Sequence, residues 1–192
     1  MEIVNNYIKV FDNVLDKGAL EAFTKICKNN IKYSPSGILN ADGSQRIDPS
    51  VRNVMGYTLS NINDSSLTNA HWASFFLGCF SHYLKEYNKN FDDFDLNVNI
   101  NDMQVLKYSE GGHYKIHIDD GPSAPRTMSF IYFVNDNYEG GNLNFRLLES
   151  KKMHVIEKVS NRLIIWPSNF MFPHAVNPVT KGERFSVVAW AR

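Results

Sequence analysis

The chain has 192 residues, of which 43% are hydrophobic and 21% charged, the proportions of one ordinary globular domain. Its 20 Lys and Arg balance 20 Asp and Glu, so it lacks the basic surplus of nucleic-acid-binding proteins, which argues against a nucleic-acid partner. No stretch of the sequence approaches the roughly 18 apolar residues of a membrane span, and no signal peptide is apparent. The two cysteines, Cys27 and Cys79, do not have the spacing of a metal site. We therefore expect a cytoplasmic protein with no membrane partner.

The first third of the sequence predicts a strand, a helix and a long loop. Residues 3–11 are expected to form the strand. The helix begins at Asp16 or Lys17 and extends to Asn29, with apolar residues at helical spacing. Residues 33–55 are rich in Gly, Ser, Asp and Asn, which favours turns, and a loop of this length in a compact domain is usually disordered or a functional lid.

A second, longer helix is expected from Leu67 to Tyr87, with its cap among residues 64–66. Its apolar residues recur at i, i+3 and i+4 and form a continuous stripe of Trp72, Phe75, Phe76, Cys79, Phe80, Tyr83, Leu84 and Tyr87. Such a stripe is typical of a helix packed on a sheet, so we expect it to be part of the core.

After residue 95 the apolar period changes to two, which indicates strands. The expected strands are residues 97–108, 114–119, 126–135, 141–148, 152–157, 162–166, 174–176 and 184–191. Eight short strands suggest a jelly roll. We therefore predict a mainly β protein with flanking helices and a cupin-like double-stranded β-helix core. It would form a single domain over residues 1–192, with the helices and a substrate loop in 1–95 and the metal-binding core in 96–192.

The run His117-Ile118-Asp119 is the strongest candidate for chemistry. Residues i and i+2 of a strand point to the same face, so both side chains would enter one cavity. His174 follows 55 residues after Asp119, and two histidines with one carboxylate form the facial triad of non-haem Fe(II) oxygenases. A lone His-x-Asp recurs by chance, but Arg184 follows ten residues after His174 and could clamp a dicarboxylate, with Ser186 adding a hydroxyl.

Three parts of the sequence resemble the 2-oxoglutarate and Fe(II)-dependent dioxygenases, and among them the prolyl 4-hydroxylase group. Residues 104–119 look like the first metal-binding hairpin of that family, and 126–135 with 139–145 look like its central strands. Residues 174–190 look like its closing hairpin, where the histidine, the Pro-Val turn, Gly-Glu, the cationic residue and the terminal Trp fall in order. The resemblance is strong from Gln104 to the end of the chain and weak before it.

The resemblance implies a role for each matching residue. His117, Asp119 and His174 would bind Fe(II), Arg184 would bind the distal carboxylate of 2-oxoglutarate, and Tyr108 would line the co-substrate pocket. The residues implied to contact the peptide substrate are Tyr114, Arg126, Trp190 and, in the loop before the core, Arg52. Without the resemblance, Tyr108, Tyr114 and Trp190 would equally fit an ordinary core.

The implied reaction is decarboxylation of 2-oxoglutarate to succinate and CO₂, coupled to hydroxylation of a protein or peptide by O₂, with proline as the expected target. The family also admits ascorbate as a reductant. Some positions depart from the family pattern: Gly140-Gly-Asn-Leu143 replaces Gly-Gly-x-Thr, and Arg192 stands where a histidine is common. These departures leave the substrate open.

Other functions remain as alternatives. The same chemistry could act on a small molecule, or on nucleic acid in an AlkB-like demethylase, although residues 184–190 match only the first arginine of the AlkB ending. A halogenase would lack the carboxylate that Asp119 supplies. The remaining alternative is a jelly-roll binding module without catalysis, which the intact ligand set argues against.

Overall fold

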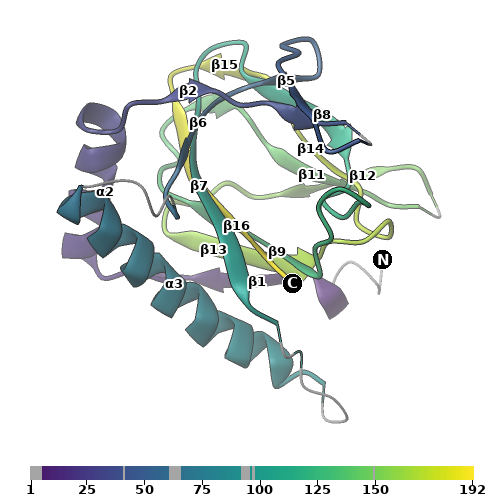
Figure 1. Ribbon diagram of the computed structural model, residues 1–192, viewed down its shortest axis with the longest axis horizontal. Helices are drawn as coiled ribbons and strands as arrows, with labels where there is room; N and C mark the ends of the chain where they lie inside the picture. The colour runs from purple at the N-terminus through teal and green to yellow at the C-terminus, as the bar shows by residue number, and fades with distance from the viewer. Residues whose placement is uncertain (1–5, 41, 61–65, 92–95, 97, 149) are drawn as a thin grey trace.

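The structure, a computed structural model, describes residues 6–40, 42–60, 66–91, 96, 98–148 and 150–192. Two antiparallel sheets face each other, and two helices cover the outer side of the larger sheet (Figure 1). The helices are α2 (Lys17–Asn29) and α3 (Leu67–Asn88). The larger sheet has the order β1 (Lys9–Asp12), β13 (Arg162–Pro167), β9 (Met128–Phe133), β16 (Arg184–Ala191), β7 (Ile100–Tyr108), β6 (Met55–Thr58) and β2 (Ser34–Pro35).

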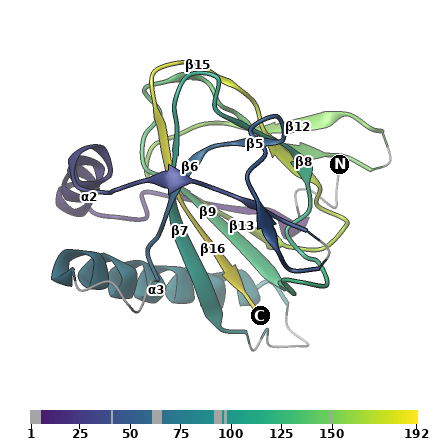
Figure 2. The ribbon, with the colours of Figure 1, turned by 45° about the horizontal axis from the view of Figure 1, so that its top comes forward.

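The smaller sheet lies on the side of the larger sheet away from the helices (Figure 2). Its order is β12 (Met153–Ile156), β11 (Leu143–Arg146), β14 (His174–Val176), β8 (His113–His117) and β5 (Arg52–Asn53). Two further strand pairs are β10 (Glu139–Gly140) with β15 (Val179–Lys181), and β3 (Ile38–Leu39) with β4 (Gln45–Arg46). The mainly β architecture with flanking helices is therefore as predicted.

Both predicted helices are confirmed, and each starts at a residue that caps it. The carboxylate of Asp16 accepts a hydrogen bond from the amide of Ala19 at 2.9 Å, and the hydroxyl of Ser66 accepts one from the amide of Asn69 at 3.3 Å. Such a side chain satisfies an amide that has no partner within the helix. Residues 64–65, the other predicted cap positions, lie outside the described residues.

Side chains of the larger sheet alternate between two cores, as β16 shows. One set faces the helices and consists of Phe185, Val187 and Ala189. The other set points between the two sheets and consists of Arg184, Ser186, Val188 and Trp190. The larger sheet thus separates a core that supports the fold from an interior in which polar side chains are placed.

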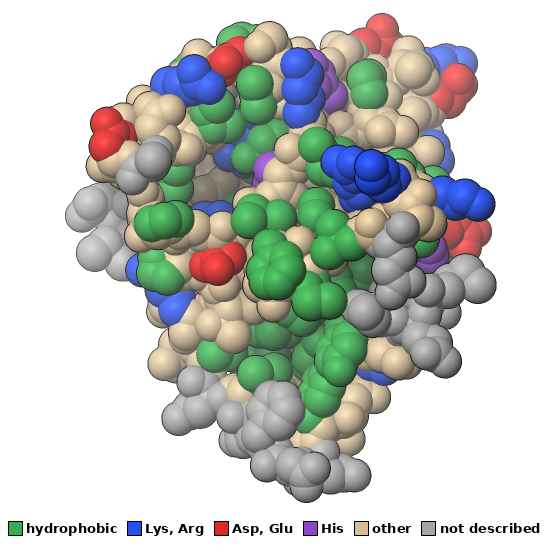
Figure 3. Space-filling view, turned by 90° about the vertical axis from the view of Figure 1, so that its right-hand side faces the viewer, with side chains coloured by type: hydrophobic (Ala, Val, Ile, Leu, Met, Phe, Trp, Pro, Cys, Tyr) green, Lys and Arg blue, Asp and Glu red, His purple; other side chains and the backbone are tan. Residues whose placement is uncertain are grey.

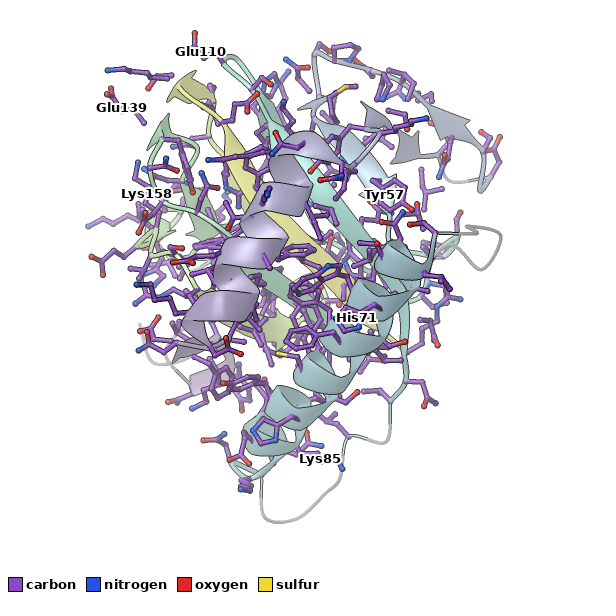
Figure 4. All side chains as sticks on the ribbon, turned by 90° about the vertical axis from the view of Figure 1, so that its left-hand side faces the viewer. Tyr57, His71, Lys85, Glu110, Glu139 and Lys158 are labelled. Atoms are coloured by element: carbon purple, nitrogen blue, oxygen red, sulfur yellow. The ribbon has the colours of Figure 1, made fainter. Side chains whose placement is uncertain are left out.

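The core between helices and sheet is rich in aromatic rings. The ring of Phe76 lies 4.6 Å from that of Phe23 on α2 and 5.5 Å from that of Tyr132 on β9. Phe80 stacks on Phe130 with 5.6 Å between the ring centroids. Figure 4 shows α2 and α3 lying across the outer face of the sheet, with side chains filling the space beneath them. The predicted apolar stripe of the longer helix therefore serves as core.

Two predictions for the N-terminal part are wrong in detail. Residues 3–11 are not one strand: Asn6 and Tyr7 are helical, β1 begins only at Lys9, and residues 3–5 lie outside the described part. Residues 33–55 are not a single irregular loop, because they contain β2, β3, β4 and β5 and the start of β6. Strands of two residues are too short to show a period, and two of them pair with distant strands, β2 with β6 and β5 with β8.

Every predicted strand after residue 95 overlaps an observed one, with some ends displaced. The strand expected over 114–119 ends at His117, so Asp119 lies in the bend beyond β8. The two-residue strand β10 and the three-residue strand β15 were not predicted. Among the described residues, no helix has the length and apolar character that crossing a membrane requires.

The aromatic core predicts the outcome of a substitution in α3. Phe76 is fully buried, so Phe76→Ala should lower the free energy of unfolding by about 3–5 kcal/mol through lost contacts and a residual cavity. Urea unfolding followed by circular dichroism would measure this. The neighbouring Leu77 is 43% exposed, and Leu77→Ala is the matched control, expected to change stability by about 0.5 kcal/mol or less. Equal losses in both variants would contradict the assigned packing.

Candidate active site

The two candidate histidines come together because their strands are neighbours. His117 is the last residue of β8 and His174 the first of β14, and the two are paired in register. Their ring centroids lie 4.3 Å apart. Antiparallel pairing thus places residues that are far apart in the sequence side by side at one end of the smaller sheet.

A bulge in β8 determines what packs beside His117. His174 pairs with His117, but Val176 pairs with Tyr114, so three steps along β8 match two along β14. The extra residue reverses the alternation of side chains, which brings Tyr114 to the same face as His117. Their rings are stacked with 3.6 Å between centroids and an interplanar angle of 18°.

Both imidazoles present the nitrogen that a metal requires. Nδ1 of His117 lies 2.8 Å from the carbonyl oxygen of Lys115, and Nδ1 of His174 lies 3.1 Å from that of Phe172. A carbonyl oxygen only accepts, so each Nδ1 is the protonated nitrogen and each Nε2 keeps a free lone pair. Backbone partners of this kind commonly orient metal-binding histidines.

The carboxylate of Asp119 completes the group, although it does so from outside the strand. Its oxygens lie 3.6 Å from Nε2 of His117 and 3.5 Å from Nε2 of His174. Each of the three residues offers one potential ligand atom, and these three atoms lie within 4.8 Å of one another. In the described part of the chain, these residues form a group that could hold a metal ion. Two imidazole nitrogens and one carboxylate fit a divalent first-row metal and leave coordination positions open.

The protonation states also suit metal binding. Burial works against ionisation of Asp119, but the imidazoles of His174 and His117 and a hydrogen bond from Ser129 outweigh it and hold the pKa of this carboxyl below its ordinary range. Burial, with the adjacent His117, lowers the pKa of His174 to about 4. At neutral pH the carboxylate is therefore ionised and this imidazole neutral, as ligation requires.

Arg184 lies deep between the sheets, and no carboxylate of the described residues pairs with it. Its side chain is 0% exposed, and its Nη1 donates to the hydroxyl of Ser186 at 3.3 Å. Nε and Nη2 have no hydrogen-bond partner within the described structure. The guanidinium carbon lies 4.8 Å from the ring centre of Tyr108 and 5.3 Å from that of Phe133. A buried cation with free donors is costly unless an anion binds to it, so this site fits a carboxylate ligand.

Gly141 allows Arg184 to take this position. A Cβ atom on Gly141 would lie 2.9 Å from Cε2 of Tyr138, 3.0 Å from Cγ2 of Val179 and 3.2 Å from Cδ of Arg184. Its φ angle of 60° lies in the left-handed region, which favours glycine. The Gly-Gly pair noted in the sequence therefore provides both the backbone turn and the space beside the guanidinium.

A cavity of about 430 Å³ opens next to the three candidate ligands, and this face of the molecule is visibly hollowed (Figure 3). Of the predicted site residues, those that line the cavity are His117, Asp119, His174, Tyr108, Tyr114, Arg126, Trp190 and Arg52. Arg184 and Ser186 do not line it, and are buried in the wall of the larger sheet, where Arg184 pairs in register with Tyr108. The β3–β4 hairpin contributes Ile38 and Leu39 to the lining.

The two predicted substrate arginines differ in how they are held. The guanidinium of Arg126 lies 3.7 Å from the ring centre of Trp190, with Nη2 3.5 Å from the carboxylate of Asp102. Arg52 donates from Nη1 to the carbonyl oxygen of Gly37 at 2.7 Å and lies 4.8 Å from the ring centre of Tyr114. Arg126 is thus paired with an acidic group, whereas Nε of Arg52 has no partner in the described structure.

Sequence reasoning did not identify Ser129, which lies on β9. Its hydroxyl donates to Oδ2 of Asp119 at 2.7 Å, and the residue is fully buried. The available signal was a small hydroxyl side chain in Met128–Phe133, a strand that is buried throughout and otherwise consists of apolar and aromatic residues. A buried polar side chain requires a partner, so it pointed to a nearby polar group.

Comparison with known proteins agrees with this geometry. Residues 103–192 match the family model of the 2OG-Fe(II) oxygenase superfamily. A PKHD-type hydroxylase of Synechococcus sp. (strain CC9902) is 32% identical over 95 residues, which cover 47% of this chain and 41% of that protein. A PKHD-type hydroxylase of Prochlorococcus marinus (strain MIT 9313) is 33% identical over 101 residues, covering 50% and 44%. The matched region is thus less than half of these relatives' length.

Solved structures resemble the chain over nearly its whole length. A prolyl-4-hydroxylase of Pseudomonas putida has a TM-score of 0.74 at 18% identity, covering 100% of this chain and 96% of that one. A Trichoplax adhaerens prolyl hydroxylase, in complex with a peptide fragment of hypoxia inducible factor, has a TM-score of 0.73 at 18% identity, covering 99% and 86%. The double-stranded β-helix fold expected from the sequence is confirmed by these neighbours.

Proposed function

We propose that this protein is an Fe(II)- and 2-oxoglutarate-dependent dioxygenase that hydroxylates a protein or peptide, with proline as the target residue. The observation that carries the proposal is the combination of His117, Asp119 and His174, whose ligand atoms converge, with the buried guanidinium of Arg184, whose Nε and Nη2 have no partner among the described residues. A metal site alone fits many reactions. A buried guanidinium with free hydrogen-bond donors favours a reaction that uses an anionic co-substrate such as 2-oxoglutarate.

Each residue has a part in this proposal. His117, Asp119 and His174 hold Fe(II), and Arg184 with Ser186 binds the distal carboxylate of 2-oxoglutarate beside Tyr108. When bound, Fe(II), 2-oxoglutarate and O₂ supply oxidation of a C–H bond, with release of succinate and CO₂. The protein positions the reactants and keeps water away from the buried part of the pocket. Ascorbate is proposed only as a reductant that keeps the iron in its ferrous state.

The mouth of the cavity supports a peptide as substrate. Leu39 and Ile118 line the cavity and remain 44% and 42% exposed, and Figure 3 shows hydrophobic side chains gathered beside the hollow. Arg126, stacked on Trp190, and Arg52, stacked on Tyr114, would donate hydrogen bonds to peptide carbonyls. The Trichoplax neighbour is a prolyl hydroxylase in complex with a peptide, which supports the same class of substrate here.

The proposal also covers organisation and location. We propose one catalytic domain over residues 1–192, in which the β3–β4 hairpin within 33–55 forms part of the substrate cavity. A cytoplasmic location is supported by the free thiols of Cys27 and Cys79, which fit a reducing compartment. Nucleic acid and membranes are not among the proposed partners.

The reaction predicts a specific pattern of turnover. With Fe(II), the protein should convert 2-oxoglutarate to succinate faster in the presence of a proline-containing peptide, and that peptide should gain the mass of one oxygen. A panel of proline-rich peptides, a methylated oligonucleotide and small prolyl compounds would be assayed for succinate and analysed by mass spectrometry. Stimulation by the oligonucleotide alone would instead indicate a nucleic-acid demethylase.

The metal ligands predict a matched loss of activity. Asp119→Ala should abolish turnover and metal binding, because only two imidazoles of the candidate ligand set in the described chain would remain. His113, a histidine on the same strand whose Nδ1 lies 2.9 Å from the carbonyl oxygen of Gly111, provides the control, and His113→Ala should retain metal binding. The metal content of each variant after gel filtration would measure its metal binding. Equal metal content in Asp119→Ala and the unaltered protein would refute the proposed site.

The buried cation predicts opposite effects on stability and on co-substrate binding. Arg184→Met should raise KM for 2-oxoglutarate by about 30-fold or more, since loss of one partner of a buried charge pair costs about 2–5 kcal/mol. The ligand-free variant should unfold at the same or a higher temperature, because the guanidinium has no acidic partner there. Arg162, which pairs with Asp12 at 2.6 Å, provides the control, and Arg162→Met should leave KM unchanged. An unchanged KM in Arg184→Met would contradict the role of Arg184.

A further inference from the structure

Two buried serine hydroxyls connect Asp119 to the larger sheet. Oγ of Ser129 lies 2.7 Å from Oδ2 of Asp119 and 2.7 Å from Oγ of Ser168. The two serines are 0% and 1% exposed. An ionised carboxylate only accepts, so the single proton of Ser129 goes to Asp119. Ser129 must then accept from Ser168, which fixes the direction of both hydrogen bonds.

The position of Ser129 explains why its hydroxyl reaches the metal ligand. On β9 it is paired in register with Trp166 of β13 on one side and Trp190 of β16 on the other. These two indoles are large and buried, and the short serine between them leaves room for the carboxylate of Asp119 to approach the inner face of the sheet. A hydroxyl is the polar group that fits this gap.

Ser168, which directly follows β13, holds the same segment a second time. Its carbonyl oxygen accepts from the amide of Asp120 at 3.1 Å, and its own amide donates to the carbonyl oxygen of Thr127 at 2.9 Å. The backbone after Asp119 and the side chain of Asp119 are therefore both tied to Ser168, one directly and one through Ser129. This matters because Asp119 lies in a bend beyond β8, where no strand ladder orients it.

We propose that Ser129 and Ser168 are positioning residues that fix the carboxylate of Asp119 beside His117 and His174 for metal binding. Oδ2 accepts the hydroxyl of Ser129 and lies 3.5 Å from Nε2 of His174, while Oδ1 lies 3.6 Å from Nε2 of His117. The hydrogen bond from Ser129 therefore restrains rotation of the carboxylate beside the two imidazoles. The nearest cation, Nη1 of Arg126, lies 3.9 Å from Oδ1, beyond hydrogen-bond distance. This inference rests on the proposed metal site.

The arrangement gives the metal site one attachment to each sheet. The two histidines belong to strands of the smaller sheet, whereas Ser129 ties the carboxylate to β9 of the larger one. Loss of the Ser129 hydroxyl would leave a buried carboxylate oxygen without its donor and free the side chain to turn. Loss of the Ser129 hydroxyl should therefore lower the metal affinity of a protein that still folds.

A double-mutant cycle tests the inference with Co(II) as the probe, measured by calorimetry and by the visible absorption spectrum of the bound ion. Ser129→Ala should weaken Co(II) binding about 10- to 100-fold, the usual effect of losing a partner of a metal ligand, and should alter the spectrum. Ser168→Ala should weaken binding less. Because Ser168 acts through Ser129, the double variant should bind no more weakly than Ser129→Ala alone.

Ser160→Ala is the matched control, since the hydroxyl of Ser160 donates to the carbonyl oxygen of Val134 away from the ligands. Its Co(II) affinity should equal that of the unaltered protein, and circular dichroism would verify that each variant is folded. Unchanged affinity in folded Ser129→Ala, or additive losses in the double variant, would overturn the positioning role alone. Failure of the unaltered protein to bind Co(II) would overturn the metal site and the proposed function with it.

Discussion

The antiparallel pairing of β8 with β14 is the contact on which the rest of the site depends. It places His117 opposite His174, and the backbone carbonyls two residues before each histidine then hold the Nδ1 atoms. The bulge in β8 adds Tyr114 to the same cluster. Since these features are properties of backbone register, the side chains need little further restraint to converge, and only Asp119, beyond the end of β8, requires hydroxyl partners of its own.

The larger sheet complements this arrangement by separating stability from chemistry. Its outer face packs on α2 and α3 through a dense aromatic core, and its inner face presents Arg184, Ser186, Ser129 and Trp190 to the interior between the sheets. Residues adjacent in sequence on β16 or β9 therefore serve different purposes. Buried polar groups, which would weaken an ordinary core, are tolerated on the inner face because partners or a ligand can satisfy them.

Much of this could be predicted from the sequence, and the parts that could not have a physical reason. The helices follow from apolar spacing and from Asp16 and Ser66 as caps, and the later strands from alternation of period two. His117, Asp119, His174 and Arg184 could be predicted as site residues from their spacing in the sequence and from side chains that can bind a metal ion or a carboxylate. By contrast, the bulge in β8, the two-residue strands of 33–55 and the partner of Ser129 are set by non-local pairing. A single sequence contains no local signal for such pairing, and the helical turn at Asn6 and Tyr7 is too short to show one.

The guanidinium of Arg184, two of whose nitrogens have no partner in the described part of the chain, has a consequence for the protein in the cell. A buried charge with free donors raises the energy of the ligand-free fold, and a dicarboxylate that satisfies it binds only the folded state. By linkage, such a ligand at 100 times its Kd stabilises the fold by about 2.7 kcal/mol. Under the proposed function, the amount of folded enzyme that escapes proteolysis would follow the supply of 2-oxoglutarate, so that central metabolism would set abundance as well as turnover.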